Sequence, residues 1–379
     1  IPPLLMTAAV SYAATLTGFA VLPADTFRPG PTSGQFIESA NHRQPPFIQQ
    51  QPVQGFSALI RASKDTYFVL SDNGFGKRNN SSEYILSIYH IEPDFHTADG
   101  GTGVIRLLDT TRLSDPERYL PYPASRTNDH VLTGADLDPE SFRQGADGSF
   151  WVGEEFNPSL LHFSQTGKLL AAPVTLDGLA STGNPLQTPA TLPRSRGFEG
   201  MAMSPDNRWL YPMLEGALLG GTGLNIYTFD IANQRFLNES ASQPSYRYRL
   251  DENATAIGDF TMFSTTGGLV IERDSAEGEK AVSKKIYRID FDQLDADSFL
   301  HKTLVADLLD IEDPHDLNRD GSTLFSFPFW TIEGLVVIDH NTLGLVNDNN
   351  YPFGSARSSN ADAPDNNEFI LIQVKPLWD

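Results

Sequence analysis

The sequence predicts an all-β protein, and within that class a β-propeller. Helical periodicity is scarce, whereas short apolar or aromatic segments alternate with clusters of Gly, Pro, Asn and Asp, which is typical of strands joined by turns. The second observation is an internal repeat. Because radially repeated four-stranded sheets form a propeller, we expect five blades, with six as the alternative if a long connection hides one. The repeats begin at segments 55–59, 138–142, 198–202, 258–262 and 332–336.

Each repeat is expected to contain the same strands in the same order. The first strand is followed by a turn and by a second strand that ends in a polar cluster, at nearly constant spacing: positions 57 and 72, 140 and 154, 199 and 215, 259 and 272, 333 and 348. Third strands are expected at 84–89, 160–163, 224–229, 285–289 and 368–374, and fourth strands at 103–108, 169–174, 246–250 and 302–305. The last repeat lacks a fourth strand, and we expect residues 16–22 to supply it and close the ring.

The 379 residues are predicted to form one propeller domain over residues 16–379. Long loops near 110–134, 177–197 and 307–329 are candidates for walls around a site. Residues 1–15 are a separate N-terminal segment, whose apolar run and small residues fit either the remnant of a signal peptide or an ordinary chain start. On the first alternative the protein is exported, to the periplasm or the medium.

The charge balance excludes several partners. With 48 acidic and 27 basic residues, the net charge is −21, so the surface repels nucleic acid and anionic membranes. No stretch approaches the roughly 20 apolar residues of a transmembrane helix, and without cysteine there is neither a disulfide nor a thiolate metal site. An anionic substrate would be repelled too, unless metal ions or a local basic cluster reverse the sign near the site.

A carboxylate recurs where four of the five first strands begin, whereas the first repeat has Ser57 there. The start of an inner propeller strand faces the central channel, so these acids need a cation or large pKa shifts to coexist. Hard divalent cations with oxygen ligands, calcium above all, suit the arrangement. The alternative is that single acids only hydrogen-bond neighbouring backbone. The predicted metal ligands are Glu140, Glu199, Asp259 and Glu333, with Asp72 and Asp348 from the polar clusters.

A second candidate cation site lies in one of the long loops. Asp316, Asn318 and Asp320, followed by Gly321, match the start of a calcium-binding loop. Position twelve of that motif is Phe327, where a bidentate Glu is expected. The alternative is an Asp-Gly turn in an acidic loop.

Catalytic groups are expected among the polar clusters and the nearby basic residues. We predict Glu155 or Glu272 as the general base, and Arg196 and Arg273 as the groups that grip phosphate oxygens. Arg273 is equally suited to a salt bridge with Glu272 or Asp274. The sequence contains no nucleophile elbow, P-loop, His-Glu-x-x-His motif or dinucleotide fingerprint, which excludes the enzyme classes that carry them.

With these motifs assembled, the chain resembles the phytase-like family, also called "esterase-like activity of phytase" proteins. The resemblance implies an exported, bacterial-type hydrolase of a phosphate ester or another ester. We therefore expect calcium- or other metal-dependent hydrolysis of a small-molecule phosphate ester. The alternatives are a calcium propeller lactonase or carboxylesterase, or a non-catalytic binding propeller with structural metal. The matching segments are 55–58, 71–76, 133–141, 150–155, 196–201, 213–216, 257–259, 270–274, 284–287, 331–334 and 346–350.

Overall fold

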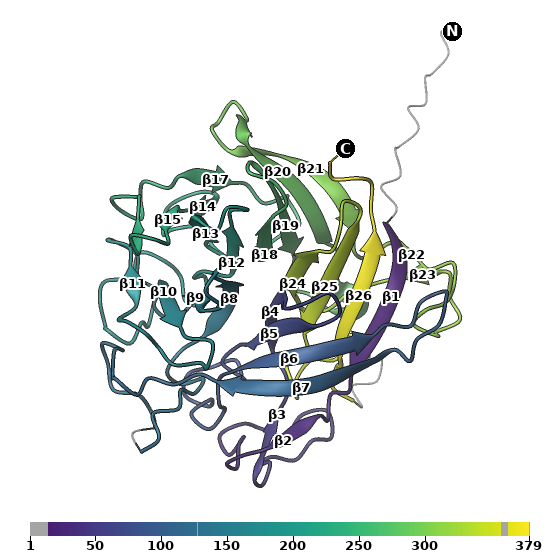
Figure 1. The fold of residues 1–379 in the computed structure, drawn as a ribbon, viewed down its shortest axis with the longest axis horizontal. Coiled ribbons are helices and arrows are strands. Elements are labelled where there is room, and N and C mark those ends of the chain that lie inside the picture. Colours follow the sequence, from purple (N-terminus) through teal and green to yellow (C-terminus); the bar gives the residue numbers. More distant parts are fainter. Residues whose placement is uncertain (1–13, 127, 358–362, 379) are drawn as a thin grey trace.

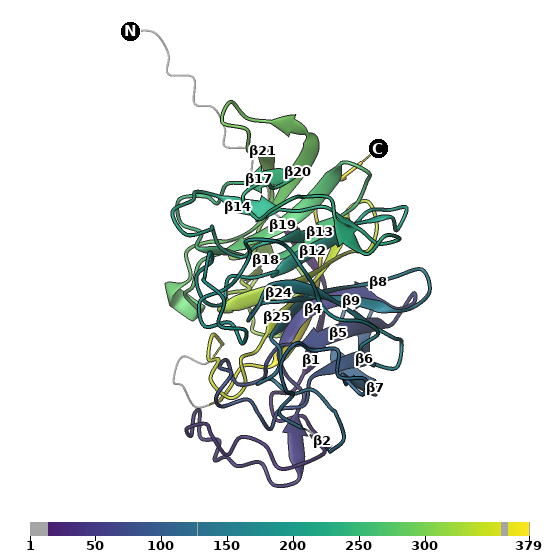
Figure 2. The same cartoon turned by 90° about the vertical axis from the view of Figure 1, so that its left-hand side faces the viewer.

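Antiparallel sheet units surround a common axis in the computed structural model, which describes residues 14–126, 128–357 and 363–378 (Figure 1). The innermost strands of five units contact one another in cyclic order, β4 with β8, β8 with β12, β12 with β18, β18 with β24 and β24 with β4. Figure 2 shows the same ring after a 90° turn. The ring of inner strands confirms the predicted all-β propeller architecture, and each segment that begins a sequence repeat provides one of these strands.

The units are described from the axis outward. The first contains β4 (Phe56–Arg61), β5 (Tyr67–Ser71), β6 (Ser87–Asp94) and β7 (Val104–Arg112). The second contains β8 (Pro139–Gln144), β9 (Phe150–Glu154), β10 (Ser159–Phe163) and β11 (Val174–Thr175). The third contains β12 (Gly200–Met203) and β13 (Trp209–Met213), then β14 (Leu224–Ile226) with β17 (Tyr246–Tyr248), and β15 (Phe229–Asp230) with β16 (Arg235–Phe236). The fourth contains β18 (Ala256–Met262), β19 (Gly267–Arg273), β20 (Lys284–Leu294) and β21 (Leu300–Asp307). The fifth contains β24 (Thr331–Val337), β25 (Thr342–Asp348), β26 (Asn367–Gln373) and β1 (Ala14–Leu22).

Short strands and a 3-10 helix lie in the connections between strands and units. The strands β2 (Phe27–Pro29) and β3 (Gln50–Pro52) pair with each other in the long segment before the first unit, which the sequence repeats do not predict. In Figures 1 and 2, β2 lies apart from the ring at the bottom of the view. The expected loop near 307–329 contains β22 (Ile311–Glu312) and β23 (Leu324–Phe325), and a 3-10 turn, η1 (Gly278–Lys280), follows β19.

The N-terminal strand closes the ring, as predicted. β1 pairs antiparallel with β26 from Thr15 opposite Gln373 to Leu22 opposite Asn367, so the two ends of the chain share one sheet. The strand begins at Ala14, slightly before the expected residue 16. Residues 1–13, on which the expectation of a signal-peptide remnant falls, lie outside the described residues.

The apolar core lies between neighbouring units and not inside one of them. Inner strands are buried on both faces, so apolar side chains of one sheet pack against those of the next. Each of five apolar clusters joins two adjacent units of the described chain. One example packs Ala58 and Leu70 of the first unit with Phe142 and Val152 of the second. This packing fixes the positions of the inner strands and therefore of the side chains that they direct toward the axis.

Leu16 tests the closing strand, because it is 1% exposed and packs with Ile370 and Ile372 of β26. Leu16→Ala is expected to lower the free energy of unfolding by about 2 to 5 kcal/mol, the usual cost of a core cavity. Thr15→Ala, on the half-buried face of the same strand, is the matched control and should cost under about 1 kcal/mol. Urea unfolding measures both, and equal small losses would contradict closure by β1.

Candidate metal-binding and catalytic site

Bulges in the inner strands set the direction of two acidic side chains. The pairing register of β8 with β9 shifts between Pro139 and Ser141, and that of β24 with β25 shifts between Ile332 and Gly334. The residue inside each shift, Glu140 or Glu333, has no partner in the ladder. Because a bulge re-aims the extra side chain, both carboxylates project from the sheet edge toward the axis of the ring.

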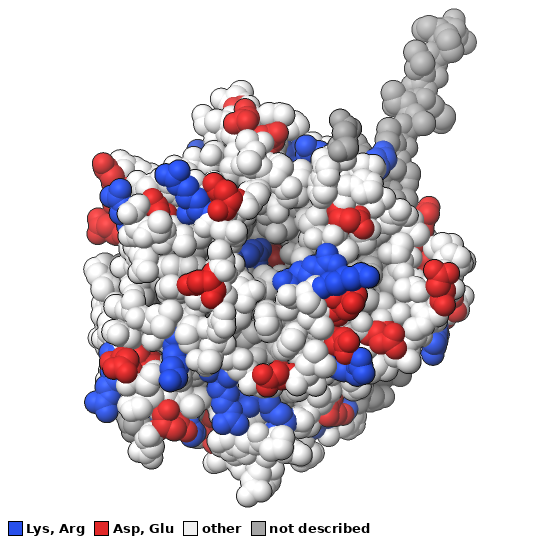
Figure 3. Space-filling model, in the orientation of Figure 1, with Lys and Arg blue, Asp and Glu red and all other residues white. Residues whose placement is uncertain are grey.

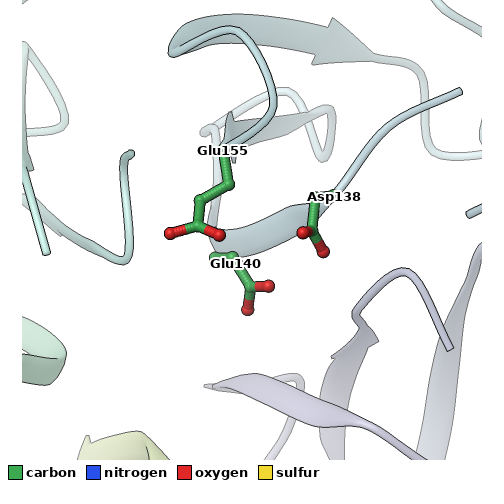
Figure 4. Close-up of side chains that lie close together, drawn as sticks. All are labelled: Asp138, Glu140 and Glu155. Carbon is green, nitrogen blue, oxygen red and sulfur yellow. The ribbon is translucent and has the colours of Figure 1, made fainter. Parts of the chain in front are cut away.

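Six buried carboxylates from three of the units gather near this axis. They form overlapping triads, in each of which one oxygen per residue lies within 4.8 Å of the others. Figure 4 shows the first triad, in which the carboxylates of two residues on β8 or just before it and one after β9 face a common space. The triads are Asp138 with Glu140 and Glu155, Glu140 with Glu199 and Glu333, and Glu155 with Glu199 and Glu215. Three of the acids therefore belong to two triads each.

Strand pairing explains why acids distant in sequence meet at one end of the channel. A first strand begins where its antiparallel second strand ends. Pro139 lies opposite Glu154, and the amide of Glu155 donates to the carbonyl of Asp138 at 3.1 Å. In the third unit the amide of Glu215 donates to the carbonyl of Gly197 at 2.9 Å. The nearly constant spacing in the sequence therefore corresponds to the length of one hairpin. The two ends of that hairpin lie together and both supply candidate ligands.

Burial and mutual repulsion raise the pKa values of these carboxyl groups. Burial raises the pKa of Glu140 well above its ordinary value, and the charges of Asp138 and Glu199 raise it further. Burial together with the charge of Glu215 does the same for the pKa of Glu155 and of Glu199. The ionised cluster is therefore unfavourable alone, and a divalent cation would relieve the repulsion. The all-oxygen donor set fits a hard cation.

Arg273 supplies a positive charge inside the cluster. Its Nη2 lies 2.8 Å from Glu215, 3.3 Å from Glu199 and 3.5 Å from Glu333. The expected salt bridge with Glu272 or Asp274 is thus not the one that forms. Burial lowers the pKa of Arg273, but the surrounding glutamates outweigh burial and hold it above its ordinary value. The guanidinium remains charged and holds three of the candidate ligands in place.

Arg196 lies at the solvent side of the same cluster. Its Nη1 is 3.0 Å from Glu215, and its side chain is 31% exposed, in contrast to the buried Arg273. A guanidinium has five N–H donors, so Arg196 keeps donors for a ligand that approaches from solvent.

Asp259, predicted as a ligand, is placed differently. Its Oδ1 lies 3.2 Å from Nη2 of Arg143, and its Oδ2 accepts a hydrogen bond from the amide of Leu335 at 2.9 Å. It belongs to none of the triads found among the described residues. In β18 the register shift lies between Ile257 and Phe260, so Asp259 lies inside it together with Gly258, whereas in β8 Glu140 alone lies inside the shift. The buried pair of Asp259 and Arg143 ties the inner strands β8, β18 and β24 together, because Asp259 also accepts the amide of Leu335.

Glu272, predicted as a base, is also outside the cluster. Its carboxylate accepts hydrogen bonds from the hydroxyl of Tyr248 and from the amide of Asp251, and pairs with Lys302. Successive side chains of a strand point to opposite faces of the sheet, so Glu272 and Arg273 lie on opposite faces, and Glu272 contacts Tyr248 and Lys302 on the outer strands β17 and β21. Within the described chain it has no contact with the triads.

Asp72 and Asp348 lie beside the triads without being members. Burial raises the pKa of Asp72 well above its ordinary value, and the charge of Asp348 is the next cause. Burial raises the pKa of Asp348 to about 6. Oδ1 of Asp72 accepts the amide of Gly74 at 2.9 Å, and Oδ1 of Asp348 accepts that of Asn350 at 2.7 Å. The hydroxyl of Thr331 donates to Oδ2 of Asp348 at 3.3 Å.

The second candidate cation site has only local contacts. Asp316 accepts the amide of Gly321 at 3.0 Å, and the amide group of Asn318 donates to Asp320 at 2.8 Å. The loop connects β22 to β23, which lie at the rim of the ring beside β1 (Figure 1). No triad of the described residues includes it. These contacts are those of the alternative, an Asp-Gly turn.

The sequence did not single out Asp138 as a ligand. It stands two residues before Glu140 in the run Asp136-Leu-Asp-Pro-Glu140, and the accumulation of acids there was the available signal. Arg143, the partner of Asp259, gave no signal in the sequence, because a cross-ring ion pair depends on which strands become neighbours.

One face of the molecule is shown in Figure 3. It is hollowed near its centre, where atoms of basic and of acidic side chains are visible, and charges of both signs are scattered around the hollow. In the described part of the chain, no helix is long and apolar enough to cross a membrane.

The sequence of the chain is similar to those of known proteins. The family model described as "Phytase-like: Esterase-like activity of phytase" matches residues 51–351. A protein of Arthroderma benhamiae described as an uncharacterized secreted protein is 31% identical over 159 residues, which cover 30% of this chain and 31% of that protein. The chain thus matches about a third of this relative's length.

Solved structures similar to the chain are more distant. A luciferin-regenerating enzyme is 11% identical, with a TM-score of 0.40 over 86% of this chain and 94% of that one. The PQQ-bound aldose sugar dehydrogenase of Streptomyces coelicolor is 10% identical, with a TM-score of 0.39 over 96% of this chain and 100% of that one.

The placement of Asp259 outside the carboxylate triads can be tested. Asp259→Asn removes the charge that balances buried Arg143, so the free energy of unfolding should fall by about 3 to 5 kcal/mol, while calcium affinity changes less than about twofold. Glu92→Gln, which breaks an ion pair with largely exposed Arg106, is the control and should cost under about 1 kcal/mol. Urea unfolding and calcium titration measure the two properties. Weakened calcium binding with unchanged stability would contradict the placement.

Proposed function

Because the chain belongs to the Phytase-like (esterase-like activity of phytase) family, we propose that it is a hydrolase of small-molecule phosphate esters that depends on a divalent cation, calcium first. The single observation that carries the proposal is the set of three overlapping triads of buried carboxylates at one end of the channel. Burial makes so many acids unfavourable without compensation, which distinguishes the cluster from ordinary exposed acidic surface.

The residues that would hold the cation are those of the triads. Calcium takes six to eight oxygen ligands in flexible geometry, and the carboxylates of Glu140, Glu155 and Glu199 are each shared between two triads. These shared carboxylates would hold the cation or cations beside the substrate. When bound, the cations supply neutralising charge and polarise a phosphoryl oxygen and the attacking water.

Glu155 is the candidate general base. Its Oε1 accepts the amide of Gly197 at 3.1 Å, which orients the carboxylate. The raised pKa of Glu155, caused by burial and by the charge of Glu215, brings it nearer to the pH at which a base works best. Glu155 takes a proton from the water as the water oxygen forms the new bond to phosphorus; the ester P–O bond breaks, and the leaving oxygen receives that proton from Glu155 and departs as an alcohol.

Arg196 and Arg273 have different proposed roles. Arg196, which is partly exposed, donates to phosphoryl oxygens from the solvent side. Arg273 is enclosed by three glutamates, so it acts as a positioning residue for them. Both reduce the repulsion that a chain of net charge −21 would exert on an anionic substrate.

Export is part of the same proposal. A relative that matches part of the chain is described as an uncharacterized secreted protein, and this description supports export to the periplasm or the medium. Fractionation of the native host with antibodies against the protein tests this directly.

Removal of one shared ligand should show whether calcium binds at the carboxylate triads or in the loop between β22 and β23. Glu140→Gln is expected to weaken calcium binding at least about tenfold and to lower turnover of phenyl phosphate about a hundredfold, because it removes a ligand from two triads. Asp316→Asn, in the rim loop, is the control and should change neither by more than about twofold. Calorimetric calcium titration and phosphate release measure the effects; turnover that persists in a chelator would refute the metal dependence.

A substrate panel separates the remaining reaction classes. Phosphomonoesters, phosphodiesters, lactones and carboxylesters should be offered to the calcium-loaded protein. Preference for phosphomonoesters is expected. Turnover of lactones or carboxylesters alone would replace the phosphate ester as substrate, and inertness across the panel despite bound calcium would indicate a binding propeller.

A further inference from the structure

A buried ion pair lies where the fourth and fifth units meet beside the carboxylate triads. Lys284, the first residue of β20, is 0% exposed, and its ammonium lies 2.9 Å from the carboxylate of Asp274, which is 5% exposed. Neither residue belongs to the triads of the described chain, and the proposed reaction uses neither. Lysine is almost never fully buried unless it is paired, so the placement of this side chain requires a reason.

The ammonium of Lys284 has three acceptors. Besides the carboxylate of Asp274, it donates to the carbonyl of Asp274 at 3.0 Å and to the carbonyl of Trp330 at 3.0 Å. An ammonium group has three N–H donors, so all of them are used and the group is held in one place. Because Trp330 directly precedes β24, this contact joins the fourth unit to the start of the inner strand of the fifth.

The irregular chain between β23 and β24 is held by donors from other segments. The carbonyl of Ser326 accepts a hydrogen bond from Arg357 at 2.7 Å, and that of Pro328 accepts one from the amide of Gly278 at 2.9 Å. The carbonyl of Trp330 is the next in this alternating series and the nearest to β24. The buried ammonium therefore fixes the place at which β24 begins.

Both partners of the ion pair are neighbours of the carboxylate cluster. Asp274 directly follows Arg273, and Lys284 lies opposite Arg273 in the ladder of β19 and β20. Glu333, a member of the triads, stands three residues after Trp330. Its distance from Nη2 of Arg273 is 3.5 Å, the longest of the three ion-pair distances of that guanidinium. The ion pair thus connects the strand that carries the guanidinium to the strand that carries a candidate ligand.

The ion pair is costly to bury. Burial lowers the pKa of Lys284 to about 8, although the hydrogen bond and charge of Asp274 oppose this shift. The Asp274 carboxylate also accepts the amides of Ala276, Val282 and Ser283, so the loop after β19 is built around it. A buried ion pair gives little more stability than apolar residues of the same volume. What this pair provides that apolar residues would not is a fixed connection to the carbonyl before β24.

We propose that Lys284 and Asp274 are positioning residues of the candidate metal site, whose ion pair holds Glu333 of the fifth unit in place beside Arg273 and the carboxylates of the other units. The inference rests on the proposed function, because it assigns the pair to the metal site of that reaction. Neither side chain touches the cation or the substrate. Both act through the start of β24, in the way that groups behind a metal ligand orient it.

Lys284→Met is the first test, because it keeps an unbranched apolar stem and removes the ammonium. Calorimetric titration should show calcium affinity about tenfold lower, the usual effect of losing a group that orients a metal ligand. Lys302→Met is the matched control, since Lys302 of the same unit pairs with Glu272 and Asp251 on the outer strands. Both variants should lower the midpoint of urea unfolding, because each leaves a carboxylate unpaired, but Lys302→Met should change calcium affinity less than about twofold. Equal calcium affinities of the two variants would overturn the positioning role.

A second variant separates positioning from charge compensation. Lys284→Met combined with Asp274→Asn removes both charges and leaves an amide oxygen as acceptor for the loop. The urea midpoint should recover much of its loss, because no buried charge remains unpaired, whereas calcium affinity should stay low. Recovery of both properties together would overturn the positioning role. If Lys284→Met alone does not fold, the double variant takes its place in the comparison with Lys302→Met.

Calcium binding and the role of the ion pair are tested separately. If the wild type binds no calcium, the proposed metal dependence fails, and crystal structures of the wild type and of the Lys284→Met variant then decide the role of the pair. Loss of the contact between Arg273 and Glu333 in the variant, with the contact between Arg273 and Glu215 retained, supports the positioning role. An unchanged contact between Arg273 and Glu333 overturns it.

Discussion

The mutual repulsion of buried carboxylates at the end of the channel is the constraint on which the rest of the structure depends. Six buried acids form overlapping triads whose oxygens lie within 4.8 Å of one another, and each charge raises the cost of ionising its neighbours. Only a rigid scaffold can hold them there. The ring provides it, since each unit packs on both faces against the next and β1 joins the two ends of the chain.

The fourth unit contributes a basic residue to the cluster, which reduces this repulsion. Where the hairpin ends of the other units present Asp72, Glu155, Glu215 and Asp348, β19 presents Arg273, whose guanidinium contacts acids of the third and fifth units. The acid that begins this unit, Asp259, is turned to Arg143. The ring is therefore asymmetric. Among the acids of the triads, those without an ion pair to a buried arginine belong to the second unit, and they are Asp138, Glu140 and Glu155.

The sequence predicted the architecture and most of the cluster, and the reason is periodicity. In each repeat the two ends of the hairpin are separated by a nearly constant number of residues. Strand pairing alone therefore places Glu155 beside the start of β8. The failures concern side-chain direction. The register shift of β18 contains Asp259 together with Gly258, and Asp259 is turned to Arg143. The alternation of β19 directs Glu272 toward Tyr248 and Lys302 on outer strands. The direction of a side chain inside a bulge and the phase of a strand depend on packing between units, which no local pattern encodes.

The asymmetry of the ring also decides from which side an anion can approach. Arg273 is enclosed, so it offers its charge to glutamates and not to a ligand. The accessible cations are Arg196 and Arg194 in the loop before β12, and Lys77 and Arg78 in the connection between β5 and β6. These loops thus bring positive charge to the acids that most need compensation. An anionic substrate entering there would meet basic side chains before it met the carboxylates, which is the order that a protein of this net charge requires.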